Sequence, residues 1–160
     1  MDQQLAEFLQ ATERCTEQLR EMLPLEQEKY QALISDDTNQ MEEMIQVQQA
    51  AIMKLKSLEA VRLDCQEKAG LGQMTSDQIL ESIPAEDKEA FTACFADLRK
   101  AAEELRICNA KAMEIARVST VFWQSMDPHA KPAAPAKVTY GAKGTAPSKM
   151  GNGSLFQTKI

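Results

Sequence analysis

Few residues in this chain have the types and spacing that metal or nucleophile chemistry requires. The 160 residues include four cysteines, Cys15, Cys65, Cys94 and Cys108, which lie far apart and form no CxxC pair. The single histidine is His129. A zinc site needs cysteine or histidine ligands at short, recurring spacings. We therefore expect no metal site, and we expect the cysteines to be small core residues that stay reduced.

Residues for acid–base or phosphate chemistry are equally scarce. The sequence contains no P-loop and no GxGxxG, HExxH or CxxCH pattern. The adjacent carboxylates Glu42–Glu43 and Glu103–Glu104 fall between the apolar positions of predicted helices, where water solvates them. His129 lies near prolines, without the oriented neighbour that a general base needs. These observations predict a binding protein with no catalytic residue and no cofactor, rather than an enzyme.

Charge is unevenly distributed along the chain. The net charge is −6, yet residues 128–160 contain five lysines and no acidic residue. An acidic body argues against a nucleic-acid partner, because phosphate contacts need a basic surface. No apolar run approaches the roughly 20 residues of a membrane span. The start, "MDQQLAEFLQ", lacks the basic and apolar regions of a secretory signal, so we expect a cytoplasmic protein.

The first predicted secondary-structure element is a long helix over residues 2–35. Its apolar residues recur at spacings of three, four and seven, which places them on one face of a helix. They are Leu5, Leu9, Thr12, Leu19, Leu23, Tyr30 and Leu33. Pro24 removes a backbone hydrogen bond, so we expect the helix to kink or split near Leu23.

A second helix is predicted over residues 38–69. Asp37 is suited to cap its start, with Gln40 three residues on. Its apolar positions are Met41, Met44, Ile45, Ala51, Ile52, Leu55, Leu58 and Cys65. The "GLG" at residues 70–72 ends this helix, since glycine is common at helix C-termini.

A short helix and a very long one follow. Thr75 and Gln78 form a predicted capping box at the start of a helix over 75–83. Pro84 is expected to open the third long helix, 84–126. At 1.5 Å per residue such a helix is roughly 60 Å long. Its apolar positions include Phe91, Cys94, Phe95, Leu98, Leu105, Cys108, Ala112, Ile115, Phe122 and Met126.

These elements predict an all-α fold: an elongated antiparallel three-helix bundle or coiled coil over residues 1–127, followed by a flexible tail over 128–160. The connections near 36–38 and 69–84 are short enough to make the long helices antiparallel. The tail holds four of the six prolines and four of the six glycines. Its few apolar side chains would each yield about 1.5–3 kcal/mol on burial. Ordering its backbone costs about 1–2 kcal/mol per residue, so it should order only on a partner or on the bundle.

The adjacent aromatic residues Phe122 and Trp123 close the long helix, with Met126 one turn later. Neighbouring helix positions point about 100° apart, so both rings cannot fill one core seam. The sequence leaves two alternatives open: core at the end of the bundle, or an apolar patch that faces a partner.

Four stretches of the sequence resemble flagellar export chaperones of the FlgN type. They are "LEQEKYQALISDD", "MEEMIQVQQAAIMKLKSLEAVR", "LRICNAKAMEIAR" and "TYGAKG". The last is similar to the Tyr-Gly-x-x-Gly of that family. The chain differs at Gln48 and Gln49, where the family often has a lysine, and at Ala112, where a second asparagine is expected.

The resemblance implies a chaperone without ATP chemistry. It would hold the C-terminal helical segment of a hook-associated (hook–filament junction) protein and deliver it to the cytoplasmic part of the type III export gate. By the same resemblance, the candidates for docking to the gate are Tyr140, Gly141 and Gly144.

The candidates for cargo contact come from the apolar pattern itself. They are Phe122, Trp123, Met126, Leu155, Phe156 and Ile160. A structural coiled-coil scaffold or adaptor with no export role is the alternative function. The sequence leaves open whether the free protein is a monomer or a homodimer.

Overall fold

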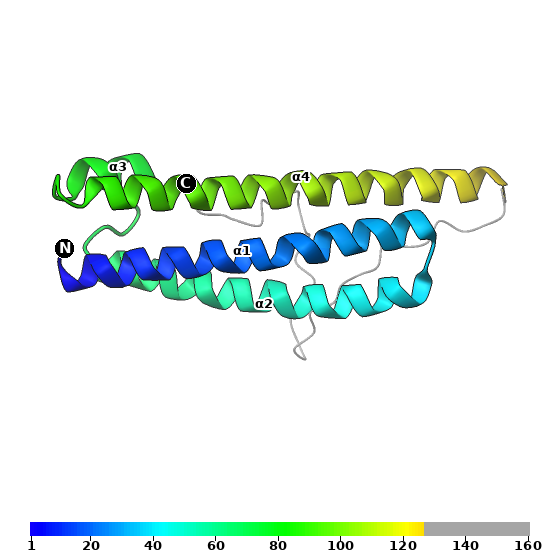
Figure 1. Ribbon diagram of the computed structural model, residues 1–160, viewed down its shortest axis with the longest axis horizontal. Helices are drawn as coiled ribbons and strands as arrows, with labels where there is room; N and C mark the ends of the chain where they lie inside the picture. Colours follow the sequence, from blue (N-terminus) through cyan, green and yellow to red (C-terminus); the bar gives the residue numbers. More distant parts are fainter. Residues whose placement is uncertain (127–160) are drawn as a thin grey trace.

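The computed structural model describes residues 1–126, and every regular element in this part of the chain is a helix. In chain order these are α1 (Gln3–Ser35), α2 (Thr38–Lys68), α3 (Ser76–Ser82) and α4 (Lys88–Met126) (Figure 1). The predicted all-helical body is confirmed. The flexible tail predicted over 128–160 lies outside the described residues.

Helix α1 is the central element of the body. It packs along both α2 and α4, whereas no Cα atom of α2 comes within 8 Å of a Cα atom of α4. Short helix α3 packs on α4 at the end of the molecule where the chain begins (Figure 1). The predicted bundle therefore has its three long helices, but α2 and α4 are held together mainly through α1.

Local capping signals are placed as the sequence predicts. The Asp37 carboxylate accepts a hydrogen bond from the backbone N–H of Gln40 at 3.0 Å. At α3, the Thr75 side chain and the Gln78 side chain each bond the other residue's backbone N–H, which completes the capping box. These bonds satisfy N–H groups that the first turn of a helix leaves without partners.

The start of α4 differs from the prediction. The helix begins at Lys88 rather than at Pro84. The backbone N–H of Asp87 bonds the Pro84 carbonyl at 3.0 Å, so these residues form a turn before the helix. The carbonyl of Asp87 then accepts the N–H of Phe91, which makes Asp87 the residue where the helical ladder starts.

Helix α1 runs unbroken through Pro24, so the predicted split is wrong. An interior proline costs about 3 kcal/mol. Met22 is buried and Leu23 packs against the same core cluster, and both lie directly before Pro24. Because each buried side chain contributes about 1.5–3 kcal/mol, tertiary packing offsets the local penalty.

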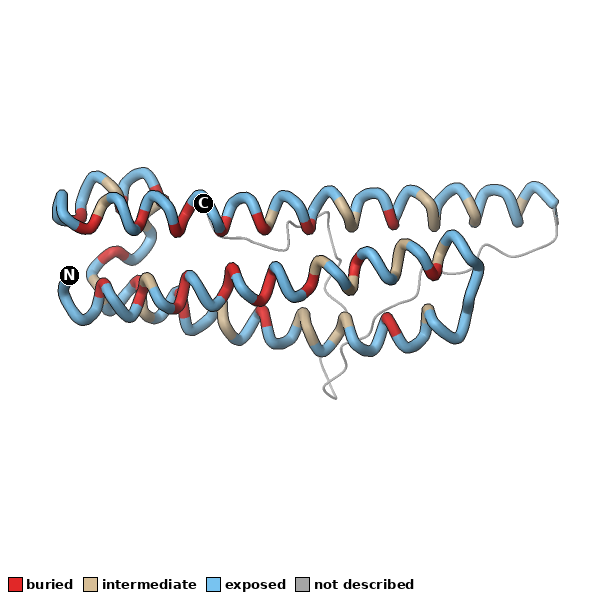
Figure 2. Tube along the Cα trace, viewed as in Figure 1, coloured by how far each residue is buried: buried red, intermediate tan, exposed pale blue. Residues whose placement is uncertain are grey.

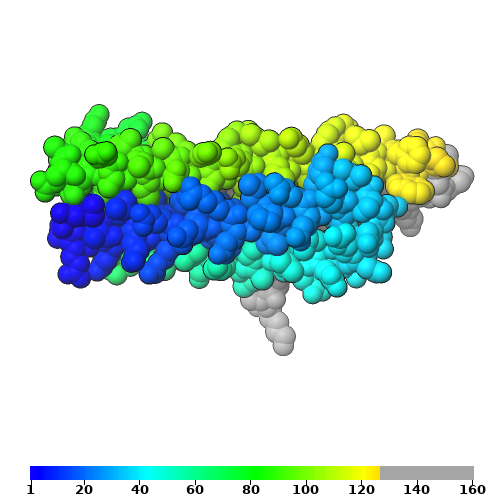
Figure 3. All heavy atoms as spheres, in the orientation of Figure 1, coloured from blue at the N-terminus to red at the C-terminus, as the bar shows by residue number. Residues whose placement is uncertain are grey.

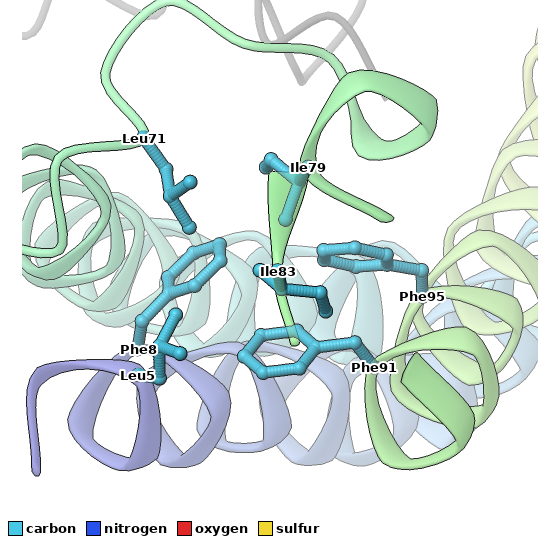
Figure 4. Close-up of a cluster of buried hydrophobic side chains, with 7 residues drawn as sticks. All are labelled: Leu5, Phe8, Leu71, Ile79, Ile83, Phe91 and Phe95. Carbon is cyan, nitrogen blue, oxygen red and sulfur yellow. The ribbon is translucent and has the colours of Figure 1, made fainter. Parts of the chain in front are cut away.

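The core is concentrated in the part of the body nearest α3 (Figure 2). Its first cluster consists of Leu5, Phe8, Leu71, Ile79, Ile83, Phe91 and Phe95 (Figure 4). Its second cluster brings together all three long helices through Cys15, Leu19, Met22, Leu55, Leu98, Ala101 and Leu105. Outside these clusters the other buried apolar residues of the described chain are Ala11, Ala32, Met44, Cys94 and Ala112.

Candidate binding surface at the distal end

The distal end of the body is where the α1–α2 turn and the C-terminal turns of α4 meet. Figure 1 shows α4 reaching beyond the α1–α2 turn, so its last turns have no helix of the described chain to cover them fully. Ala112 is the last buried residue of α4, and none of residues 113–126 is buried. This end is therefore the part of the described surface with the least internal packing.

An exposed apolar strip runs along these last turns. We call it the distal apolar face and define it by Val118, Val121, Phe122 and Met126, which are 51%, 54%, 55% and 65% exposed. Spacings of three and four place the four side chains on one side of α4. Exposed apolar residues are common singly, but a contiguous set marks an interaction surface.

Trp123 points to a different side of α4 from Phe122. It lines a groove of about 350 Å³ that also includes Ala32, Leu33, Asp36, Met41 and Ala116. We call this the end groove. Figure 3 shows the last described turns of α4 lying beside the end of α1 on one face of the molecule.

The two aromatic rings remain in contact although they serve different surfaces. Their centroids are 5.9 Å apart in an edge-to-face arrangement. Trp123 is 57% exposed and Phe122 is 55% exposed, so neither belongs to a core. Of the two alternatives from the sequence, burial at the bundle end is wrong, and partner contact stays a prediction.

A polar layer separates the packed core from the distal end. Lys29 Nζ lies 2.6 Å from Glu26 Oε2, and it also donates to Asn109 Oδ1 on α4 at 3.2 Å. Gln48 on α2 donates to Glu26 Oε1 at 3.0 Å. The Glu26 and Lys29 side chains are only 10% and 15% exposed, so charge-assisted bonds from three helices replace the water they lose.

The α1–α2 hairpin gives the distal end a negative charge. Residues 30–53 contain four acidic side chains, Asp36, Asp37, Glu42 and Glu43, and no lysine or arginine. On the neighbouring part of α4, Arg117 pairs with Glu114 at 2.6 Å. Apolar and acidic groups thus lie side by side around the end groove.

Of the four cysteines, Cys15 and Cys94 are buried, whereas Cys65 and Cys108 are half-buried. Burial raises the pKa of Cys15 to about 12 and that of Cys94 to about 11, so both thiols stay protonated at neutral pH. Within residues 1–126, no group of three histidine, cysteine, aspartate or glutamate side chains is placed to hold a metal ion. In the same range, no helix is long and apolar enough to cross a membrane.

The described residues include three of the nine predicted contact residues, all from the cargo set. Phe122, Trp123 and Met126 come together on the last turns of α4. The other predicted residues, Tyr140, Gly141, Gly144, Leu155, Phe156 and Ile160, lie outside the described residues. Sequence reasoning missed Val118 and Val121, although Val118 precedes Val121 by three residues and Phe122 by four, which are spacings that signal a shared face.

Comparison with known proteins gives one match. A family model described as FlgN protein matches residues 1–148, which covers the whole described body. No curated protein and no solved structure matches the chain significantly.

Proposed function

Because the chain belongs to the FlgN family, whose members are flagellar export chaperones, we propose that it binds the C-terminal helical segments of hook-associated proteins. It keeps them unassembled and delivers them to the type III export gate. The family supplies the chaperone role, whereas cargo, gate and a cytoplasmic location are proposed. The protein acts by binding alone, without catalysis.

The distal apolar face is the observation that carries the cargo site. An amphipathic segment binds by laying its apolar face on a complementary apolar surface. Val118, Val121, Phe122 and Met126 form such a surface, each more than half exposed in the free protein. The apolar tail residues Leu155, Phe156 and Ile160 are proposed to add contacts to the same cargo.

Delivery is proposed to use a separate part of the chain. Tyr140, Gly141 and Gly144 lie in "TYGAKG" and are the gate-docking candidates. When cargo binding orders a segment of the chain, the entropy cost of that ordering offsets part of the favourable contact energy. A moderate affinity suits a chaperone that must release its cargo at the gate.

Co-purification tests this proposal. The full chain is co-expressed with a hook-associated protein and isolated through a tag on the chaperone. Phe122→Ser removes one apolar anchor, worth about 1.5–3 kcal/mol, which is about a 10- to 100-fold loss of affinity. Recovery of no junction protein by a folded wild-type chain would overturn the proposed cargo.

The alternative from the sequence is a structural scaffold. A scaffold would form a stable higher-order assembly through its helices and would be indifferent to Phe122→Ser. Light scattering on the purified chain measures its mass and also settles whether it is a monomer or a homodimer.

A further inference from the structure

The end groove is lined by apolar side chains, by neutral polar side chains and by one carboxylate, that of Asp36. Ala32, Leu33, Ala116 and Trp123 supply apolar walls, and Asp36 lies among them. The hairpin around it has four acidic residues and no basic one over residues 30–53. The chemistry that complements such a groove is a short apolar segment with neighbouring lysines.

The chain contains a segment of that chemistry beyond the described residues. Residues 128–160 have five lysines and no acidic residue. We call Leu155, Phe156 and Ile160 the terminal cluster; Lys149 precedes it, and Lys159 lies within it, directly before Ile160. The sign of the charge and the apolar side chains both match the end groove.

The groove also lies where this segment begins. Trp123 lines the groove and Met126 ends the described part of α4. In the sequence Asp127 and then Pro128 follow Met126, and proline disfavours a longer helix because it restricts the residue before it and lacks an N–H. The terminal cluster follows Met126 by about 30 residues, for which a coil spans about 30 Å on average. Such a tether gives a local concentration in the millimolar range, so weak contacts suffice.

We propose that the end groove binds the terminal cluster of the same chain when no partner is present. The apolar side chains contact the walls beside Trp123, and the neighbouring lysines Lys149 and Lys159 face the acidic hairpin. The contact keeps an adhesive segment covered on the free protein. Its consequence for cargo rests on the proposed function: cargo and groove then compete for Leu155, Phe156 and Ile160.

Trp123 is the only tryptophan and reports directly on the groove. The experiment compares acrylamide quenching of the full chain with that of the full-length variant Leu155→Ser/Phe156→Ser/Ile160→Ser. We expect acrylamide to quench Trp123 of the wild-type chain about two-fold less, or weaker still, than Trp123 of the serine variant. A segment that is docked more than half of the time shields the ring for that share of the time. Equal quenching of the two proteins would overturn the contact.

Two paired variants test the charge complementarity. Glu42→Gln/Glu43→Gln removes two exposed carboxylates from the acidic hairpin. Glu86→Gln/Glu89→Gln removes two exposed carboxylates at the opposite end of the body. Only the first pair is expected to raise the quenching of Trp123 towards that of the serine variant. An equal effect of both pairs, or of neither, contradicts the charged contact.

Concentration separates this contact from a contact with a second copy. A contact within one chain gives the same quenching at all protein concentrations, and the protein remains a monomer by light scattering. Protection that grows with concentration and accompanies dimer formation would overturn the intramolecular assignment. All these measurements use the free protein, so a failed cargo assay leaves them interpretable.

Discussion

Lys29 on α1 donates a hydrogen bond from Nζ to Asn109 Oδ1 on α4 at 3.2 Å, and this pair marks where close packing of the body ends. On one side lie two apolar clusters that connect the long helices. On the other side α4 buries only Ala112. The polar layer thus divides a well-packed body from a distal end with little internal packing.

Loss of Lys29 should destabilise the body. Lys29→Ala leaves the nearly buried Glu26 carboxylate without its 2.6 Å ion pair. A buried group deprived of its partner costs about 1–3 kcal/mol, more when charged. Urea unfolding followed by circular dichroism measures the loss. Lys68→Ala is the control, since its 2.6 Å pair with Asp64 is exposed and screened by solvent, so its loss should hardly change the stability. Equal losses would mean that the polar layer adds nothing beyond a surface ion pair.

Substitution of two nearby glycines by alanine should change the stability of the fold in different directions. Gly70 has a φ of +74°, and the Leu71 N–H bonds the Gln66 carbonyl at 3.0 Å to close the end of α2. Alanine fits the space at Gly70 but pays about 1–2 kcal/mol for the left-handed backbone. At Gly72 an added Cβ meets nothing closer than 3.7 Å, so alanine should be neutral or stabilise by about 0.4–1 kcal/mol. Thermal unfolding of both variants checks the order, and a larger loss at Gly72 would refute it.

The four thiols should react in two classes. Burial, with the nearby Glu59 carboxylate, raises the pKa of Cys15 from 9.0 to about 12, and burial raises that of Cys94 to about 11. Between pH 8 and 10 both remain protonated in the folded chain, and a protonated thiol is a poor nucleophile. Iodoacetamide should therefore modify the half-buried Cys65 and Cys108 first, as mass spectrometry of peptides would show.

The same shifts predict a pH dependence of stability. A thiol whose folded pKa is raised favours the folded state below its unfolded pKa, and that contribution is lost as pH rises through the folded pKa. The free energy of unfolding should therefore fall above pH 9 because the unfolded chain ionises there first.

For the labelling experiment, faster modification of Cys15 than of Cys108 in the folded protein would contradict the burial of Cys15.

Two methionines on α4 give a matched test of the distal apolar face. Met126 and Met113 are each 65% exposed, but they lie on opposite sides of the helix. Met126→Ser should weaken cargo binding by about 10-fold, the equivalent of about 1.4 kcal/mol, while Met113→Ser leaves it unchanged. Titration calorimetry with a hook-associated segment measures both. Equal effects would place the cargo elsewhere, and unchanged circular dichroism confirms that each variant is folded.

The sequence predicts most helix bounds because their signals are local. Asp37, Thr75 and Gly70 mark ends through bonds within a few residues, and the structure places the ends there. The start of α4 was misplaced because Pro84 is compatible with both a helix and a turn. The split at Pro24 was wrong because a local penalty says nothing of the packing around it.

The candidate surface is only partly readable from the sequence. Phe122, Trp123 and Met126 were identified as a possible partner patch, but periodicity assigned the same apolar positions to a core. No local pattern predicts that Lys29 meets Asn109, since the two lie about 80 residues apart.

The sequence by itself determined an all-helical, acidic body, its capping sites and its family. The tertiary structure decided which apolar residues of α4 are buried. The reason is the relative length of the helices: α1 and α2 turn back at Asp36, whereas α4 continues past that turn (Figure 1). A seam is buried only where another helix lies closely against it, so Phe122, which does not line the end groove, stays exposed and Trp123, which does, is only partly covered.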